Sequence, residues 1–386
     1  MIQSRSFRLL VAVCGAVTVA VAPSSAVEIN KDLVQSWKVL VEGAPISGAN
    51  GLAFDAEDRL HIASVLGREI VVMDPRTGKI LDRLGPAVGV ETPDDLTFGP
   101  AGSIYQDDLF WTAIFTGEVG RLTPDGVKIT AGQVFPGVNP ITFSDTSRLF
   151  VAHDFFGFAG LYEIDPEGIL PPVELDPDFY NLNGFDFSPD GLLYGPIFQE
   201  KIIRVDVDSG PPPLWFENVL DPFASAAVKF DARGNLYALN VDRVVRVDLG
   251  TGDVDVVAEV GHGLDNLAFD SRGRLYVSSF VDGTIYRVLP SGEARELSRG
   301  GMILPGGVSV QPRPRGGDSV VVADCFSFRE FNGRTGRPGA FEEVFGSAQT
   351  VAPHGEDLVV SSWNTNVVEI RDGETLHLVD SVGLFA

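Results

Sequence analysis

The sequence predicts an all-β protein, a single β-propeller of four-stranded blades built from eight sequence repeats. Three observations predict it: a recurring hairpin motif, a spacing of 39 to 45 residues between copies, and a high content of turn formers, with 43 glycines and 25 prolines among 386 residues. Several short strands in a repeat of roughly 40–50 residues are typical of propellers. Seven or six blades plus flanking strands remain alternatives, because the last two copies depart from the pattern.

The hairpin motif is clearest at residues 183–194, which read Asn-Gly-Phe-Asp-Phe-Ser-Pro-Asp-Gly-Leu-Leu-Tyr. Residues 185–187 alternate apolar and polar side chains, as a strand with one buried face does. Residues 188–191 form a turn, because proline presets φ and glycine tolerates positive φ. Residues 192–194 then begin the return strand.

The strand residue Phe187 marks the position of each copy along the chain. Its equivalents in the other repeats are Phe54, Phe98, Phe143, Phe230, Phe269, Val310 and a weaker copy at Ala352. A third strand such as residues 202–206 follows each hairpin, and a fourth such as residues 255–260 leads into the next repeat. Four strands per repeat make one blade.

The two ends of the predicted propeller domain, residues 27–386, each carry an additional strand. Residues 37–41 and residues 376–379 both match the position of a fourth strand. Since propellers commonly pair strands from opposite chain ends and so remove exposed edges, one of the two is predicted to close the ring.

Residues 1–26 read as a Sec-type signal peptide, cleaved after Ala26. Arg5 and Arg8 precede an apolar run, and small residues follow it. A secreted or periplasmic protein is therefore expected, with no membrane insertion after cleavage. Cys325 is then the single cysteine, so no intramolecular disulfide forms. The remaining 27 basic and 53 acidic residues argue against nucleic acid and anionic membranes as partners.

The residues four positions before each marker are predicted to meet at one mouth of the propeller. Five of the eight carry a side-chain oxygen, and in chain order the positions hold Asn50, Asp94, Asn139, Asn183, Ala226, Asp265, Gly306 and Ala348. The following positions add Asp95 and Asn266. Amide and carboxylate oxygens suit a hard divalent cation such as Ca²⁺. The alternative is that these residues cap strand starts by bonding their own backbone.

Two histidines are candidate general bases near this mouth. His153 follows a second strand and precedes Asp154, a carboxylate that would orient it, and His262 lies three residues before Asp265. A structural or surface role is the alternative for both. The aromatic residues 155–158 and 110–111 follow or end second strands, where they either wall an apolar substrate pocket or pack between blades.

The blocks at residues 50–55, 183–191 and 264–270 resemble the regucalcin/gluconolactonase superfamily, which includes strictosidine synthase-like and paraoxonase-like propellers. Generic NHL-type propellers share part of this pattern. The resemblance implies a divalent metal, often Ca²⁺, with Asn183 as a ligand, Asp265 as ligand or base, and Asp94 at a substrate-contacting position. Two features depart from the family: Asn50 stands where the first-blade glutamate is expected, and the repeats exceed six.

The resemblance implies a hydrolase of a lactone or ester, and the converging oxygens predict that it depends on a metal. Catalytic residues would be Asp265, His153 and His262, and metal ligands Asn50, Asp94, Asn139, Asn183 and Asp265, with a small-molecule substrate at the mouth. The alternative is a non-enzymatic NHL-type propeller that binds a ligand or protein partner. The sequence does not give the oligomeric state.

Overall fold

The computed structural model describes residues 38–313, 316–362 and 367–383. The predicted signal peptide and Trp37 therefore lie outside the described residues. The described chain is built from antiparallel strands and one short 3₁₀ helix, η1 (Pro86–Val88). Within these ranges, no helix is long and apolar enough to span a membrane.

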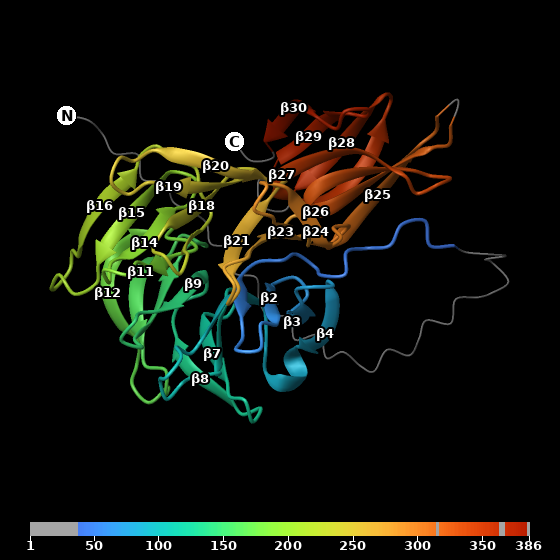
Figure 1. The fold of residues 1–386 in the computed structure, drawn as a ribbon. Coiled ribbons are helices and arrows are strands. Elements are labelled where there is room, and N and C mark those ends of the chain that lie inside the picture. The colour runs from blue at the N-terminus through green and yellow to red at the C-terminus, as the bar shows by residue number, and fades with distance from the viewer. Residues whose placement is uncertain (1–37, 314–315, 363–366, 384–386) are drawn as a thin grey trace, which may run out of the picture. The chain divides into compact units, whose positions relative to one another are not determined.

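The first six repeats each form one four-stranded antiparallel sheet, here called blades 1 to 6 (Figure 1). Blades 1 to 3 contain β1 (Leu52–Phe54), β2 (Leu60–Ser64), β3 (Glu69–Asp74), β4 (Lys79–Leu84); β5 (Pro93–Phe98), β6 (Leu109–Ala113), β7 (Glu118–Leu122), β8 (Lys128–Gln133); β9 (Val138–Phe143), β10 (Leu149–His153), β11 (Ala159–Ile164) and β12 (Val173–Tyr180). Blades 4 to 6 contain β13 (Asp186–Phe187), β14 (Leu193–Ile197), β15 (Lys201–Asp206), β16 (Trp215–Leu220); β17 (Val228–Phe230), β18 (Leu236–Asn240), β19 (Arg243–Val247), β20 (Val254–Glu259); β21 (Leu264–Phe269), β22 (Leu275–Ser279), β23 (Ile285–Val288) and β24 (Ala294–Ser298).

The hairpins form where the sequence predicts them, because their turns are locally determined. Asp55 accepts hydrogen bonds from the backbone N–H groups of Glu57 and Arg59 through Oδ1, and Asp231 and Asp270 repeat this arrangement in blades 5 and 6. Such side-chain to backbone bonds fix a tight turn without long-range contacts. Each turn then starts a second strand in register with the first.

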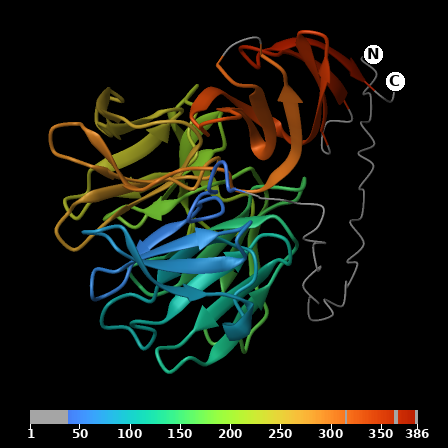
Figure 2. The same cartoon turned by 90° about the vertical axis from the view of Figure 1, so that its right-hand side faces the viewer.

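The first strands of the six blades form a closed ring. β1 lies against β5 on one side and against β21 on the other, and the remaining inner strands contact one another in chain order. In Figures 1 and 2 the gold strands of blade 6 accordingly return to the blue strands of blade 1. The prediction of a propeller of four-stranded blades lined by its first strands is confirmed, and the ring itself has six blades.

Apolar cores fill the interfaces between neighbouring blades. Trp111 and Ile70 belong to the core between blades 1 and 2, and comparable clusters lie at each following interface. The cluster that joins blade 6 to blade 1 includes Tyr276 and Ile62, both fully buried. Burial of this apolar surface closes the ring, so the prediction that a strand from one chain end completes a blade is wrong. Residues 38–41 are not in a strand.

The last two repeats together form one six-stranded sheet, called here the C-terminal sheet. Its strands are β25 (Pro305–Gln311), β26 (Ser319–Asn332), β27 (Pro338–His354), β28 (Asp357–Ser362), β29 (Val367–Asp372) and β30 (Leu378–Gly383). It has its own apolar core, which includes Phe328 and Leu358. Residues 378–379, expected to close the ring, lie instead in β30 and pair with β29. This arrangement corresponds to the alternative of six blades plus flanking strands.

The close approach of β1 to β5 gives a test of the ring. Gly51 donates its N–H to the Asp94 carbonyl (2.8 Å), and a Cβ on Gly51 would lie 2.6 Å from Asp95 Cα. We expect Gly51→Ala to lower the free energy of unfolding by about 1–3 kcal/mol through overpacking. Denaturant unfolding followed by circular dichroism measures this. Gly383→Ala is the control, because a Cβ at that position meets nothing within 4 Å. Equal stability of both variants would contradict the close packing of β1 against β5.

Candidate functional site

The candidate site is the mouth of the ring, meaning the end at which the six inner strands begin. Asp94, Asn139 and Asn183 are buried there, each about 5–6% exposed, and Asp265 is half-buried. Asn50 also stands at the start of its blade and its carbonyl accepts a hydrogen bond from Ser278 Oγ (2.6 Å). The structure therefore places all five predicted ligand residues at inner-strand starts. Gly306 and Ala348 belong to the C-terminal sheet and not to the ring.

At the mouth, burial and the charges of neighbouring carboxylates raise the pKa values of Asp94 and Asp265. Burial first, and then the charges of Asp265, Asp95 and Asp154, hold the pKa of Asp94 well above its usual range. Burial, with the charges of Asp95 and Asp154, raises the pKa of Asp265 to about 8. Burial raises the pKa of Asp154 to about 7. The charges that act on Asp94 and Asp265 are thus all negative, which is a setting that favours a bound cation.

Asp95 has a different, structural role. Its Oδ1 accepts hydrogen bonds from Leu96 N and from Asn266 Nδ2 (3.0 Å), and its Oδ2 accepts one from Ile141 N (3.1 Å). These bonds link blades 2, 3 and 6 across blade 1, where Gly51 leaves the necessary room. Burial raises the pKa of Asp95 to about 6, against the effects of Lys229 and these N–H donors. Asp95 therefore ties inner strands together.

The asparagine side chains at the mouth hydrogen-bond to a neighbouring carboxylate or to the backbone, and their amide oxygens can still bind a cation. Asn139 Nδ2 lies 3.5 Å from Asp154 Oδ2 and donates to it. Asn183 Oδ1 accepts from Gly184 N at 2.7 Å, and Asn50 Oδ1 from Val65 N at 3.5 Å. The backbone bonds of Asn183 and Asn50 fit the capping interpretation as well as the ligand interpretation, since each oxygen retains a further lone pair.

Neither predicted histidine occupies the position of a general base. His153 is fully buried, and its Nδ1 and Nε2 contact the carbonyls of Ala159 (3.2 Å) and Phe135 (2.9 Å). Both ring nitrogens face backbone carbonyls inside the fold, which favours the structural alternative for His153 over the role of a base. His262 is exposed, and its ring packs against Phe341 of β27 at 5.4 Å between centroids.

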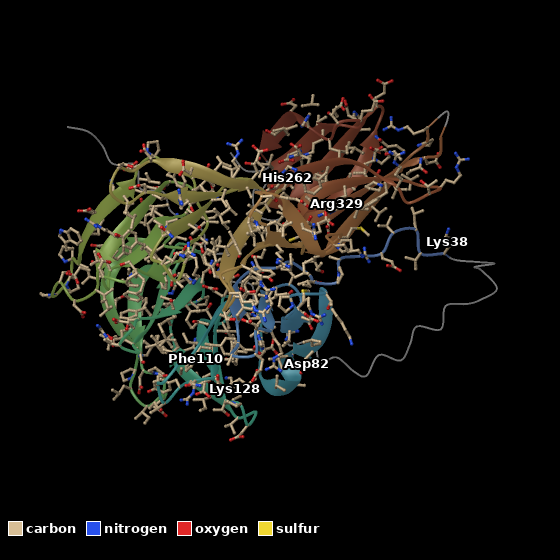
Figure 3. The ribbon with its side chains drawn as sticks, viewed as in Figure 1. Lys38, Asp82, Phe110, Lys128, His262 and Arg329 are labelled. Atoms are coloured by element: carbon tan, nitrogen blue, oxygen red, sulfur yellow. The ribbon has the colours of Figure 1, made fainter. Side chains whose placement is uncertain are left out.

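His262 instead marks the contact between blade 6 and the C-terminal sheet. Arg329 of β26, which lies near His262 in Figure 3, donates from Nη2 to the Val281 carbonyl (3.1 Å). Phe280 and Phe326 pack edge to face at 5.2 Å across the same contact. The C-terminal sheet therefore rests on the loops of blade 6 that border the Asp265 side of the mouth.

The donor set suits a hard cation, although the acidic groups do not form a closed cage. Among the described residues, no group of three or more His, Cys, Asp or Glu is placed to hold a metal ion. The oxygens present come from carboxylates and amides, and Asp154 Oδ1 is buried without a hydrogen-bond partner in the described chain. Ca²⁺ accepts such mixed ligands and completes its shell with water. The chemistry of these oxygens is therefore that of Ca²⁺ ligands, with amides and water as part of the coordination.

Three residues that help to form the mouth were not predicted in that role from the sequence: Asp154, Thr112 and Ser278. Asp154 was expected only to orient His153, yet its carboxylate belongs to the acidic group. Thr112 Oγ1 donates to the Asn139 carbonyl, as Ser278 Oγ does to that of Asn50. Each hydroxyl lies on a second strand and fixes the mouth residue of the following blade. Thr112 and Ser278 occupy equivalent positions in their blades. Each directly follows a second-strand residue, Trp111 or Val277, that pairs with the first strand of its blade. A hydroxyl residue repeated at this position is a signal in the sequence that could have identified both.

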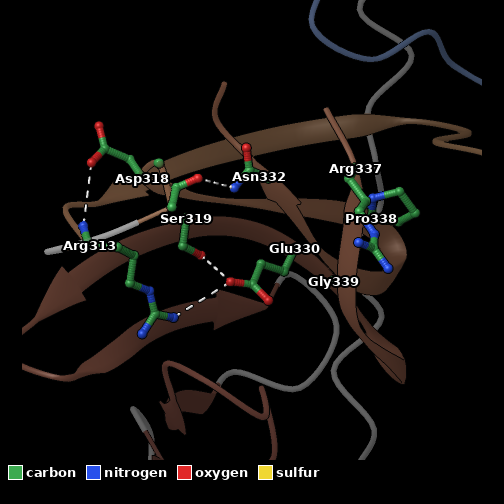
Figure 4. A pocket seen from close by; sticks show the side chains of 10 residues that line it. Arg313, Asp318, Ser319, Glu330, Asn332, Arg337, Pro338 and Gly339 are labelled. Atoms are coloured by element: carbon green, nitrogen blue, oxygen red, sulfur yellow. Dashed lines mark hydrogen bonds and ion pairs between the residues drawn. The ribbon is translucent and has the colours of Figure 1, made fainter. Parts of the chain in front are cut away.

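The C-terminal sheet contains a cavity of about 270 Å³ that lies apart from the mouth (Figure 4). Several of its polar groups are already paired within the sheet. Ser319 Oγ donates to Glu330 Oε1 (2.6 Å), Arg313 lies 3.5 Å from Glu330, and Asn332 donates to the Gly316 carbonyl. We assign no site to this cavity, because Ser319, Glu330 and Asn332 already bond to one another or to the backbone around them.

Comparison with known proteins supports the fold. A crystal structure assigned to the gluconolactonases matches with a TM-score of 0.52 and 15% identity, covering 67% of this chain and 91% of that chain. A gluconolactonase from Xanthomonas campestris matches with a TM-score of 0.50 and 16% identity, covering 61% and 84%. Regucalcin from Agrobacterium tumefaciens, a calcium-binding protein, gives 0.47 and 18%, covering 63% and 85%. No family model and no curated protein matches the chain. The chain therefore has the fold of the gluconolactonase propellers, as the resemblance of its sequence blocks implied.

The raised pKa values predict how stability depends on pH. Folded Asp265, Asp154 and Asp94 bind protons more tightly than unfolded aspartate, whose pKa is about 3.9. The folded state then holds more protons, so its stability falls as pH rises from about 4 through about 8. In EDTA we expect the melting temperature to fall by roughly 5 °C or more between pH 5.5 and 8.5. Asp265→Asn should make the melting temperature depend less on pH. An unchanged dependence would contradict the raised pKa of Asp265.

Proposed function

We propose that this protein is a metal-dependent hydrolase of a lactone or ester that uses Ca²⁺ or another divalent cation. The observation that carries the proposal is the group of carboxylates Asp94, Asp154 and Asp265 at the mouth, whose pKa values are raised by burial and, for Asp94 and Asp265, also by neighbouring carboxylates. The gluconolactonase fold supports the reaction class without identifying the substrate.

The residues at the mouth divide into ligands and a base. Asp94, Asp265, Asn139 and Asn183 would hold the cation, with Asn50 at the edge of the set. A bound divalent cation polarises a carbonyl and stabilises the oxyanion that forms on it. Asp265 would also be the base that accepts a proton from water, which is the second role that the family resemblance implies for it.

Asp265 gives a direct test of the metal site. We expect about one equivalent of calcium in the purified protein by elemental analysis, and a lower melting temperature after EDTA. Asp265→Ala should remove the calcium and reduce kcat/KM on lactones by about 100-fold or more, since base and ligand are lost together. Calcium titration followed by calorimetry measures the binding separately from turnover.

The matched control for this test is Asp125→Asn, an exposed turn residue, which should bind calcium and turn over substrate as the wild type does. Unchanged turnover in Asp265→Ala would refute the proposal. A protein that binds no calcium and shows no EDTA shift would instead favour the alternative, a propeller that binds a ligand or partner without catalysis.

We also propose that the chain is exported, because residues 1–26 have the composition of a signal peptide. Expression of the full chain in a bacterial host should place the protein in the periplasm or medium, with Val27 as its first residue by N-terminal sequencing. Replacing Val11 and Val13 with lysine should keep it in the cytoplasm. A full-length N-terminus on exported protein would contradict cleavage after Ala26.

A further inference from the structure

Six phenylalanines gather on the loops of blades 2, 3 and 4 at the mouth. We call them the phenylalanine wall: Phe115, Phe135, Phe155, Phe156, Phe158 and Phe198. Phe115, Phe135 and Phe156 are 52%, 60% and 52% exposed. Single exposed apolar residues are common, but neighbouring large aromatics at the edge of a polar site indicate an interaction surface.

The wall is ordered by contacts among its own rings. Phe115 stacks on Phe156 with centroids 5.9 Å apart, and Phe135 stacks on Phe158 at 5.0 Å with an interplanar angle of 4°. Phe155 and Phe198 approach to 6.2 Å. Aromatic pairs at these distances attract one another, so the rings present an arranged apolar surface.

Backbone pairing fixes this surface beside the acidic group. Ala113 pairs with Pro93, so Phe115 follows the strand end that adjoins Asp94. Asp154 immediately precedes Phe155, and both residues donate their N–H groups to the Gly137 carbonyl (3.0 and 3.3 Å). The wall therefore shares a loop with Asp154 and follows the strand end beside Asp94, so it borders the same mouth.

The charge of the mouth restricts what these rings bind. The groups that act on Asp94 and Asp265 are carboxylates, and the chain as a whole has a net charge of −24. An anionic ligand would be repelled, whereas a neutral molecule with an apolar part would bury that part on the rings. A polyhydroxylated sugar lactone offers little surface of this kind.

We infer that the phenylalanine wall binds the alkyl or aryl group of a neutral lactone or ester, so that the substrate is hydrophobic. This inference rests on the hydrolase function proposed above. In the reaction, water oxygen adds to the carbonyl carbon and the acyl C–O bond breaks. The alcohol oxygen takes a proton, and the acid product ionises.

The test compares γ-phenyl-γ-butyrolactone, γ-butyrolactone and gluconolactone as substrates of the calcium-loaded protein. Loss of one or two ring contacts to a phenyl group changes affinity by about tenfold. We expect wild-type kcat/KM to be about tenfold or more higher for the phenyl lactone than for the other two. The double variant Phe115→Ser/Phe156→Ser should lower kcat/KM for the phenyl lactone by about tenfold and so abolish this preference.

Two controls keep the outcomes separate. Phe216→Ser removes a ring of similar exposure (47%) from the outer strand of blade 4 and should retain the preference. If the double variant has a lower melting temperature than the wild type, the single variant Phe115→Ser replaces it in the comparison of substrates. Turnover of γ-butyrolactone without a wall-dependent preference would overturn the inference but not the hydrolase function. Binding to phosphatidylcholine vesicles that depends on the wall, with unaltered selectivity, would also overturn it. No turnover of any lactone would overturn both.

Discussion

The structure depends on the packing of each blade against its neighbours. Each interface buries apolar side chains from two blades, and the interface between blades 6 and 1, with Tyr276 and Ile62, closes the ring without any strand exchanged between the chain ends. Hydrophobic burial has no directional requirement, so it can join sheets whose edges are not hydrogen-bonded to each other. Closure then fixes where the six inner strands begin, and with them every group at the mouth.

Small residues on the inner strands make the acidic mouth possible. Gly51 leaves space for Asp95 to reach Asn266, and Gly184 leaves space for Ala227 of the next blade. With the strands so close, Asp94, Asp154 and Asp265 are brought together although burial and mutual repulsion oppose their ionisation. Sites of this kind reduce stability locally and are retained where a function uses them. The neighbouring phenylalanine wall gives the same mouth an apolar border.

The C-terminal sheet shows how a repeat can leave the ring. β26 has 14 residues and β27 has 17, far longer than the strands of blades 1 to 6, and the two pair with each other. Repeats seven and eight are thereby joined into one continuous sheet with its own core. A sheet built in this way cannot be inserted between blades 6 and 1, whose apolar faces already cover one another. It contacts the loops of blade 6 instead, where Arg329 bonds to Val281.

The sequence by itself determined the features that depend on neighbouring residues. The turns at Asp55, Asp231 and Asp270 are held by bonds within a few residues, so the hairpins, their period and the position of Asp94, Asn139 and Asp265 at strand starts followed from the pattern. Only the tertiary structure decided the blade count, the closing interface, the structural role of His153 and the place of Asp154 among the carboxylates. These features arise from contacts between residues far apart in the chain, and such contacts leave no local periodic signal in a sequence.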